Sequence, residues 1–275
     1  MAKNVQITQD DVLASRIFFF SALPLLKVIA ESEPKYGDKF KGKNFVFQVS
    51  AKYDGVECGK MGTHFVVEDG KWSVVVGKVH ETPDVEFVFP NLRNFCIFFS
   101  GKGMPLPKIK GMLKLGILVP VLMTLLRMAG LLQSKEAPKS PADQIMLVKL
   151  FFYLLPNGIS QLNKMNQPDV KKFTINSPDR AYAFAVTGID ELQSWLRIKA
   201  GNSKAGRGEY PRCKPFLTMR FDSTQHALDI LMKKGDMMEY MRNKWLTVEG
   251  APEFGGEFGN LLFKVGFYAQ GEYLG

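Results

Sequence analysis

The chain has 275 residues, of which 46% are hydrophobic, and its 36 Lys and Arg against 27 Asp and Glu give a formal net charge of +9 at pH 7. This composition excludes a disordered chain and supplies enough apolar side chains for one large core or two smaller ones. The positive charge favours phosphate-bearing surfaces or ligands over acidic protein tails as partners. Charge alone does not distinguish nucleic acid from an anionic lipid surface.

Three cysteines, Cys58, Cys96 and Cys213, show no metal-ligand spacing, and their odd number leaves one thiol unpaired in any disulfide scheme. We therefore expect free thiols, no metal site and no cofactor. Residues 1–11 are polar and lack the basic start and apolar stretch of a secretory signal. Together these features predict a cytoplasmic protein.

The first elements alternate between helix and strand signals. Residues 11–32 predict a largely buried helix, because apolar side chains occupy much of its circumference, and Pro24 is expected to kink it. Residues 45–50 alternate in the manner of a strand. Further along, Asp69-Gly70 lies between two apolar runs and predicts a β-hairpin, since both turn residues tolerate positive φ.

A further strand and a second helix follow. Residues 85–89 place apolar side chains on alternate positions, and Asn91 then predicts the N-cap of a helix that carries apolar residues at three- and four-residue spacing. A short strand is expected near residues 108–111. The order predicted for this half is helix, antiparallel strands, helix, strand and helix.

The last helix of this half, residues 112–132, is the most apolar segment of the chain. Its length approaches the roughly 20 residues of a membrane-spanning helix. Lys114, Pro120 and Arg127 argue against a spanning segment. We predict instead a helix that is buried or that touches a membrane surface.

The second half of the chain repeats this order of signals, which predicts two similar domains. The matched pairs are residues 16–20 with 149–153, residues 85–89 with 217–221, Gly111 with Gly250, Gly116 with Gly255, and Trp72 with Trp195. The second copy carries an insertion at residues 237–243. Polar residues and Pro at 134–140 predict a linker between domains at 1–133 and 141–275.

Several of these segments carry a family resemblance. They are residues 65–72, residues 83–85, the helix with Phe95, Gly101-Lys102-Gly103 with Pro105, residues 108–111, residues 233–236 and residues 248–250. In their order and spacing they resemble the sterol carrier protein type two family. The second half departs from it, with residues 188–190 in place of the Asp-Gly turn and a Gly- and Lys-rich loop at 201–212.

The resemblance implies an α+β fold in which each copy has a mostly antiparallel five-stranded sheet covered by helices. It also implies an apolar tunnel between sheet and helices that takes fatty acids, fatty acyl-coenzyme A, sterols or phospholipids. We therefore predict non-catalytic binding or transfer of lipid. The alternative is an accessory or substrate-presenting subunit with a lipid-metabolising enzyme as its partner.

No enzyme is predicted, because the three histidines form no close pair and no GxSxG motif occurs. Nucleic acid is not an expected partner either, since the basic residues are not interleaved with aromatic ones in a recognisable module. Expected partners are a lipid or acyl-coenzyme A ligand and a peripheral membrane surface.

Candidate site residues fall into two groups. The predicted apolar lining of the tunnel consists of Phe87, Phe89, Phe95, Phe99, Leu115, Leu118, Val119, Leu122, Leu126, Phe254, Phe258, Leu261 and Leu262. Packing of the same helices between the two domains is the alternative for these residues. The predicted contacts with an anionic head group or membrane are Lys102, Lys108, Lys110 and Lys114. A solvated surface is the alternative for these lysines.

Overall fold

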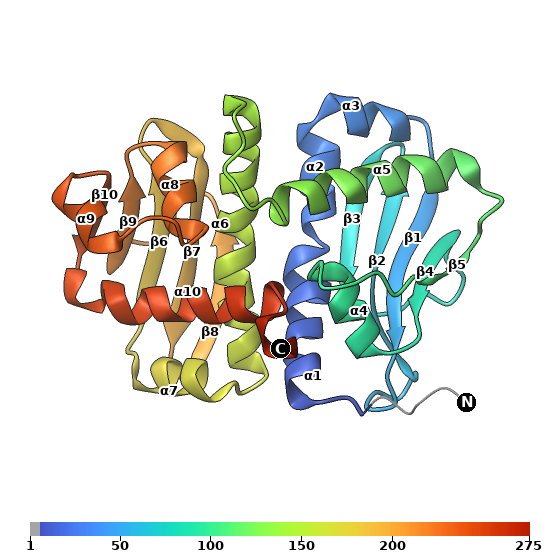
Figure 1. Cartoon of the computed structure of the whole chain (residues 1–275), viewed down its shortest axis with the longest axis horizontal. Coiled ribbons are helices and arrows are strands. Elements are labelled where there is room, and N and C mark those ends of the chain that lie inside the picture. Colours follow the sequence, from blue (N-terminus) through green and yellow to red (C-terminus); the bar gives the residue numbers. More distant parts are fainter. Residues whose placement is uncertain (1–5) are drawn as a thin grey trace. The chain divides into compact units, whose positions relative to one another are not determined.

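The computed structural model describes residues 6–275 and shows two α+β units (Figure 1). The first unit contains the described residues up to Gln133 together with Phe267–Gly275, and the second unit is Ser134–Gly266. Residues 1–5, which form part of the N-terminal segment used to argue against a secretory signal, lie outside the described residues.

The first unit begins with helices and continues into a sheet. Its elements are α1 (Gln9–Ile17), the π-helix η1 (Phe18–Ala22), α2 (Leu25–Ser32), α3 (Pro34–Gly37), the 3₁₀ turn η2 (Asp38–Phe40), β1 (Phe45–Lys52), β2 (Lys60–Glu68), β3 (Lys71–Val76), β4 (Val85–Phe89), α4 (Leu92–Phe99), β5 (Lys108–Lys110) and α5 (Leu115–Leu132).

The second unit has a similar element order with one helix added. Its elements are α6 (Pro141–Lys164), α7 (Pro168–Asn176), β6 (Arg180–Val186), β7 (Ile189–Lys199), β8 (Asn202–Arg207), β9 (Leu217–Phe221), α8 (Thr224–Leu231), α9 (Met237–Arg242), β10 (Leu246–Gly250), η3 (Pro252–Phe254) and most of α10 (Gly255–Ala269). The end of α10 from Phe267 and the 3₁₀ turn η4 (Glu272–Leu274) belong to the first unit. The helix α9 occupies the insertion predicted at residues 237–243.

Both sheets have five strands and the same topology. Their strand orders are β3-β2-β1-β4-β5 and β8-β7-β6-β9-β10. In each, the central strand pairs in parallel with the strand that follows the hairpin, and all other pairs are antiparallel. The sheets are therefore mixed, because the chain crosses over after β3 and β8 and returns on the other side of β1 and β6. The predicted α+β class is confirmed.

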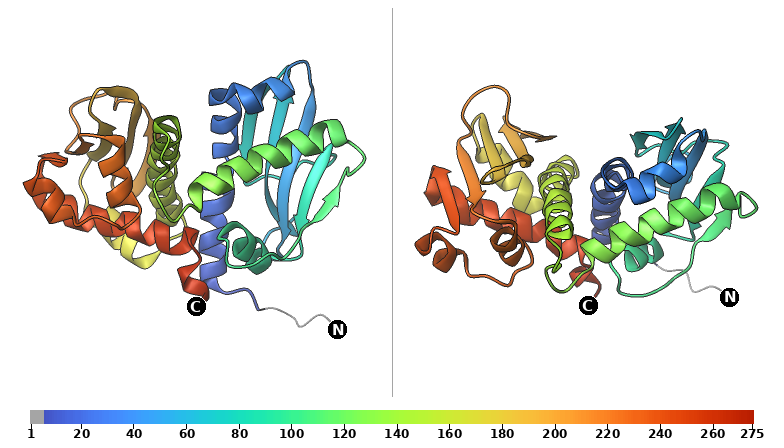
Figure 2. Two further views of the ribbon diagram at one scale, coloured as in Figure 1. Left: turned by 45° about the horizontal axis from the view of Figure 1, so that its top comes forward. Right: turned by 90° about the horizontal axis from the view of Figure 1, so that it is seen from above.

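Helices cover one face of each sheet (Figure 2). In the first unit Phe47, Phe65 and Val85 lie on this face and are fully buried. Alternate residues of the same strands, such as Gln48 and Glu86, lie on the opposite face. The period of two in the sequence thus becomes one hydrophobic face and one polar face.

Several local predictions for the first unit are confirmed. Asp69 and Gly70 take φ of 49° and 76° between β2 and β3, as a tight hairpin requires. The Asn91 side chain accepts a hydrogen bond from the backbone of Asn94 and caps α4. Pro24 stands at the end of the π-helix and begins α2, so the predicted kink is a break in the first helix.

The proposed match between Trp72 and Trp195 is wrong. Trp72 lies on β3, whereas Trp195 lies on β7, which occupies the position of β2 in its sheet. The hairpin turn that corresponds to Asp69-Gly70 is Ala200-Gly201, with φ of 48° and 75°. The residue types at this turn do not predict it, because Ala rarely adopts positive φ.

The predicted loop at 201–212 is also corrected, since it contains the edge strand β8. Gly206 stands in this strand, where a Cβ atom would approach the Trp195 ring to 2.1 Å. Glycine weakens the sequence signal for a strand but allows the Trp195 ring to lie against the backbone of its neighbour.

Gly111 and Gly250 occupy equivalent positions in the two units. Gly111 directly follows β5 and Gly250 is the last residue of β10, and both have positive φ, 77° and 95°. A Cβ atom on Gly111 would lie 2.0 Å from the Asp84 carbonyl oxygen, and one on Gly250 would lie 2.1 Å from the Phe216 carbonyl oxygen. Both sites therefore exclude any side chain, for steric and conformational reasons.

We expect Gly111→Ala to destabilise the protein by at least about 2 kcal/mol, because the change adds a backbone clash to a strained φ. Gly116→Ala is the matched control, since a Cβ atom at this position in α5 would have no neighbour within 4 Å. Urea denaturation measures both effects. Equal stability of the two variants would show that the turn before α5 adjusts freely.

Candidate functional site

The predicted aromatic lining lies inside the core of the first unit. Phe87, Phe89 and Phe95 are at most 5% exposed. Phe19 stacks on Phe95 with ring centroids 4.0 Å apart, and Phe89 contacts Phe95 at 5.4 Å. Phe99 is half-buried in the same cluster. These rings pack against one another and fill the space between them, as core residues do.

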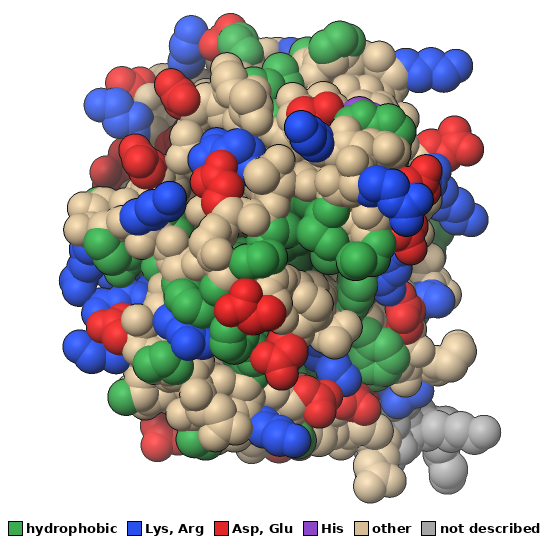
Figure 3. Space-filling view, turned by 90° about the vertical axis from the view of Figure 1, so that its left-hand side faces the viewer, with side chains coloured by type: hydrophobic (Ala, Val, Ile, Leu, Met, Phe, Trp, Pro, Cys, Tyr) green, Lys and Arg blue, Asp and Glu red, His purple; other side chains and the backbone are tan. Residues whose placement is uncertain are grey.

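In the second unit the predicted residues are likewise buried or half-buried. Phe258, Leu261 and Leu262 are buried, and the Phe258 ring stacks on Tyr182 with centroids 4.6 Å apart. Phe254 is half-buried and contacts Phe216 at 5.2 Å. Figure 3 faces the surface at α9 and β10, where hydrophobic side chains gather in the middle among acidic and basic ones.

The predicted residues of α5 lie on its outer face, with the exception of Leu118, which is 9% exposed. Leu115, Val119, Leu122 and Leu126 are 62%, 49%, 41% and 62% exposed. Their spacing of four, three and four residues aligns them along one side of a helix. We call these four residues the α5 stripe.

The helix α5 is unusual among the apolar helices of this chain. Within residues 6–275, three helical stretches are long and apolar enough to cross a membrane: Gln9–Ser32, Leu115–Leu132 and Pro141–Lys164. In the first and third, 78% and 72% of the apolar window is buried, but in Leu115–Leu132 only 33% is buried. The most apolar of the three therefore has the least cover.

The opposite side of α5 explains why the helix stays attached. Val121 and Met128 are buried where α5 packs against α2. Arg127 donates hydrogen bonds to both oxygens of the Glu33 carboxylate, with its Nε 3.0 Å from Oε2 and its Nη2 3.0 Å from Oε1. This bidentate pair fixes which side of α5 faces the unit and leaves the α5 stripe outside.

Four further exposed apolar residues precede α5 and were not singled out in the sequence. Met104, Leu106, Met112 and Leu113 are 80%, 72%, 61% and 97% exposed. They flank the short strand β5, in a segment that shows no regular period. The available signal was the density of large apolar residues among Pro, Gly and Lys, outside any helix or strand pattern.

The four predicted lysines behave in two ways. Lys110 forms an ion pair with Glu86 at 2.8 Å, and Lys114 pairs with Asp84. Lys102 and Lys108 are exposed and have no ion-pair partner within the part of the chain that the structure describes. These two lysines are therefore the ones available to an anionic ligand.

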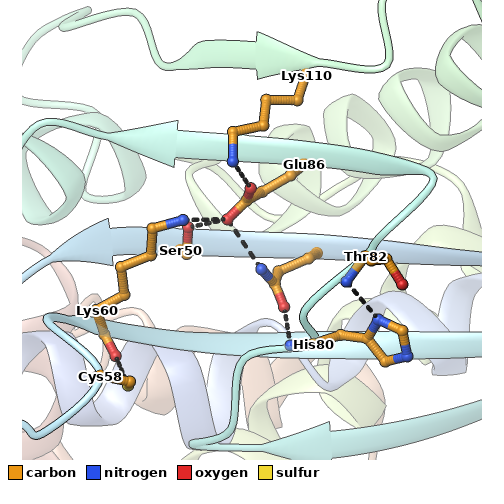
Figure 4. Close-up of polar contacts among 8 residues, drawn as sticks. Ser50, Cys58, Lys60, His80, Thr82, Glu86 and Lys110 are labelled. Carbon is orange, nitrogen blue, oxygen red and sulfur yellow. Dashed lines mark hydrogen bonds and ion pairs between the residues drawn. The ribbon is translucent and has the colours of Figure 1, made fainter.

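Glu86 organises a polar cluster on the sheet face away from the helices (Figure 4). Its carboxylate is 1% exposed and accepts hydrogen bonds from Gln48 at 2.8 Å, Ser50 at 2.7 Å and Lys60 at 3.2 Å. Lys110 pairs with its second oxygen. Burial alone would raise the pKa of Glu86, but these donors outweigh it and lower the pKa to about 2.

The three histidines form local polar contacts with neighbouring residues. His64 Nδ1 lies 2.8 Å from the Lys78 carbonyl oxygen, and the backbone of His80 donates to Gln48. His226 Nδ1 lies 2.7 Å from Asp222, and its ring stacks on Trp245. Within residues 6–275, no group of three or more His, Cys, Asp or Glu side chains could hold a metal ion.

Cys96 lies in the core beneath α1. Burial raises the pKa of its thiol to about 12, although a hydrogen bond with Tyr273 acts in the opposite direction. Tyr273 also donates to Asp11 at 3.2 Å, which attaches the C-terminal segment to the first unit. A thiol in this environment is a packing group and a poor nucleophile.

Comparisons with known proteins add little to this geometry. No family model matches the sequence. A search of curated proteins also finds no match. A solution structure from Thermus thermophilus, of a conserved hypothetical protein suggested to be a sterol carrier protein, aligns with a TM-score of 0.28 and 14% identity over 40% of this chain and 82% of that one.

A stereoselective inverting sec-alkylsulfatase from Pseudomonas sp. aligns with a TM-score of 0.27 and 13% identity, over 48% of this chain and 29% of the alkylsulfatase. The chain therefore spans less than a third of that enzyme. At these scores neither alignment carries an argument about activity.

Glu86→Gln should destabilise the protein by about 3 kcal/mol at neutral pH, because it leaves Lys60 and Lys110 without their partner. A pKa lowered to about 2 means that the stabilisation is complete above the usual Glu pKa and is lost as pH falls through about 2. The difference between variant and parent should therefore shrink to about 1 kcal/mol at pH 3.

Urea denaturation at both pH values measures this difference. Glu249→Gln is the control, because the Arg220–Glu249 pair is about one-third exposed and should contribute less than about 1 kcal/mol. A pH-independent effect of Glu86→Gln would show that the carboxylate is not the group responsible.

Thiol labelling under native conditions should modify Cys58 and Cys213, which are exposed, at least about 100-fold faster than Cys96. Unfolding in urea should equalise the three rates. Mass spectrometry of the labelled peptides distinguishes the sites, and rapid native labelling of Cys96 would contradict the packing described for it.

Proposed function

We propose that this chain is a non-catalytic lipid-binding protein and that the α5 stripe provides its contact with hydrocarbon. The observation that supports this proposal is the exposure of Leu115, Val119, Leu122 and Leu126 on a helix whose other side is packed in the core. Each methylene of an acyl chain removed from water contributes about 0.8 kcal/mol, so a chain laid along such a stripe gains affinity without specific polar contacts.

The charge of the surrounding segment favours an anionic or phosphate-bearing lipid. Residues 101–132 contain four lysines and Arg127 and no Asp or Glu. Three of these five side chains pair with acidic residues elsewhere in the unit, and Lys102 and Lys108 are exposed. A hydrocarbon tail on the stripe would therefore have these two lysines available for a carboxylate or phosphate head group. Fatty acids, fatty acyl-coenzyme A and phospholipids all satisfy this requirement, and sterols satisfy its apolar part.

The proposal places the ligand on α5 in preference to the aromatic cluster. An acyl chain in a tunnel between sheet and helices would have to displace Phe19, Phe89 and Phe95, whose rings contact one another at 4.0 and 5.4 Å. The stripe requires no such displacement. A tunnel remains part of the proposal only as a space that opens beside α5 when the ligand binds.

The absence of catalysis is part of the same proposal. Binding by desolvation needs no nucleophile or general base, and the buried thiol of Cys96 has a raised pKa. Three free cysteines, two of them exposed, suit a reducing compartment, which supports a cytoplasmic location.

Protein purified without detergent should retain lipid, and native mass spectrometry should show adducts that organic extraction removes. The extracted lipid identifies the ligand class. Purified protein without adducts that also fails to bind any added fatty acid, acyl-coenzyme A, sterol or phospholipid would contradict the proposal.

Substitution of Leu122 and Leu126 by Ser should weaken the binding of a fluorescent fatty acid, measured without vesicles, by about twenty-fold or more, because it removes apolar contact area from the stripe. A matched variant with Ile175 and Met238 changed to Ser removes two exposed apolar side chains, 60% and 67% exposed, from the second unit. Its affinity should equal that of the parent. Equal losses in both variants would show that the ligand is not bound at α5.

A further inference from the structure

The segment before α5 exposes large apolar side chains on a backbone that is held in place. We define residues 102–114 as the docking loop. Met104, Leu106, Met112 and Leu113 expose most of their side chains, and the value for Leu113 is 97%. Large apolar side chains that gather at a protein surface mark a place where another apolar surface is met.

The exposure of these side chains is a property of a loop that is held in place. Within it, β5 pairs with β4 at the edge of the first sheet, and Lys110 is opposite Glu86 (Figure 1). Gly111 lies against the Asp84 carbonyl, and Lys114 pairs with the Asp84 carboxylate. These contacts fix the backbone on both sides of Met112 and Leu113, so their position is maintained without a partner.

The charges of the docking loop indicate the chemistry of the partner. Lys102 before Met104 and Lys108 after Leu106 are both exposed, and residues 101–132 contain no acidic residue. Lysine is depleted in the cores of protein interfaces, whose energetic centres are rich in Trp, Tyr and Arg. The docking loop contains none of these three residues. Aliphatic side chains with adjacent lysines match the boundary between phosphates and acyl chains in a bilayer.

We propose that the docking loop attaches the first unit to anionic lipid bilayers. Met104, Leu106, Met112 and Leu113 enter the boundary between head groups and acyl chains, while Lys102 and Lys108 contact lipid phosphates. The loop runs directly into Leu115, the first residue of the α5 stripe. This inference rests on the proposed function and adds the surface from which the stripe would take its lipid.

The test uses the full chain and vesicle flotation at low salt. Vesicles of phosphatidylcholine with about 30% phosphatidylserine should bind the protein at least about ten-fold more strongly than phosphatidylcholine alone, and about 0.5 M salt should reduce binding to the anionic vesicles. Met104→Ser combined with Leu113→Ser should lower binding about ten-fold or more.

Two matched controls separate the docking loop from general effects. Changing Ile175 and Met238 to Ser removes comparably exposed apolar side chains elsewhere and should leave vesicle binding unchanged. For the charges, Lys102→Glu with Lys108→Glu should lower binding more than about ten-fold. Lys71→Glu with Lys214→Glu makes the same change in net charge at other exposed sites and should have little effect.

Several outcomes would overturn the inference. These are no preference for anionic vesicles, equal losses in loop and control variants, or self-association of the chain that the loop variants abolish while vesicles remain unbound. Resistance of bound protein to an alkaline carbonate wash would indicate an inserted helix in place of surface docking. If the protein binds fatty acid in solution but does not bind vesicles, the inference about the docking loop is wrong and the proposed function still stands.

Discussion

A helix that is apolar around much of its circumference can bury only one side against its own unit, and α5 is in this position. Its inner side packs against α2 and is fixed by the Arg127–Glu33 pair. Its outer side then exposes the α5 stripe to solvent. The free-energy cost of this exposure is offset by the aromatic core. An apolar ligand that covers the α5 stripe would recover that free energy as binding energy.

Ion pairs on the polar face of the first sheet hold the segment that leads into α5. Glu86 is buried and charged, with four donors around it, and one of these is Lys110 on the edge strand β5. Asp84 similarly pairs with Lys114 at the start of α5. Glu86 on β4 and Asp84 directly before β4 thus hold the chain at Lys110 and at Lys114, because removing either carboxylate would leave a cation without its partner.

These ion pairs also separate the basic residues by role. In the sequence Lys102, Lys108, Lys110 and Lys114 form a single cluster before an apolar helix. In the structure two of them hold the chain and two are exposed without an ion-pair partner among the described residues. The distinction depends on Asp84 and Glu86, which are distant in sequence and reach the lysines only because β5 pairs with β4.

The sequence by itself determined those features that depend on neighbouring residues: the alternation that makes strands, the Asp69-Gly70 turn, the Asn91 cap and the break at Pro24. Where local chemistry was atypical, as at Ala200-Gly201, the sequence led to a wrong match. Tertiary structure alone decided that β1 pairs in parallel with β4, that Phe89 and Phe95 fill the core, and that the α5 stripe stays outside. The reason is that both the inner and the outer side of α5 are rich in large apolar residues, so only packing against α2 distinguishes them.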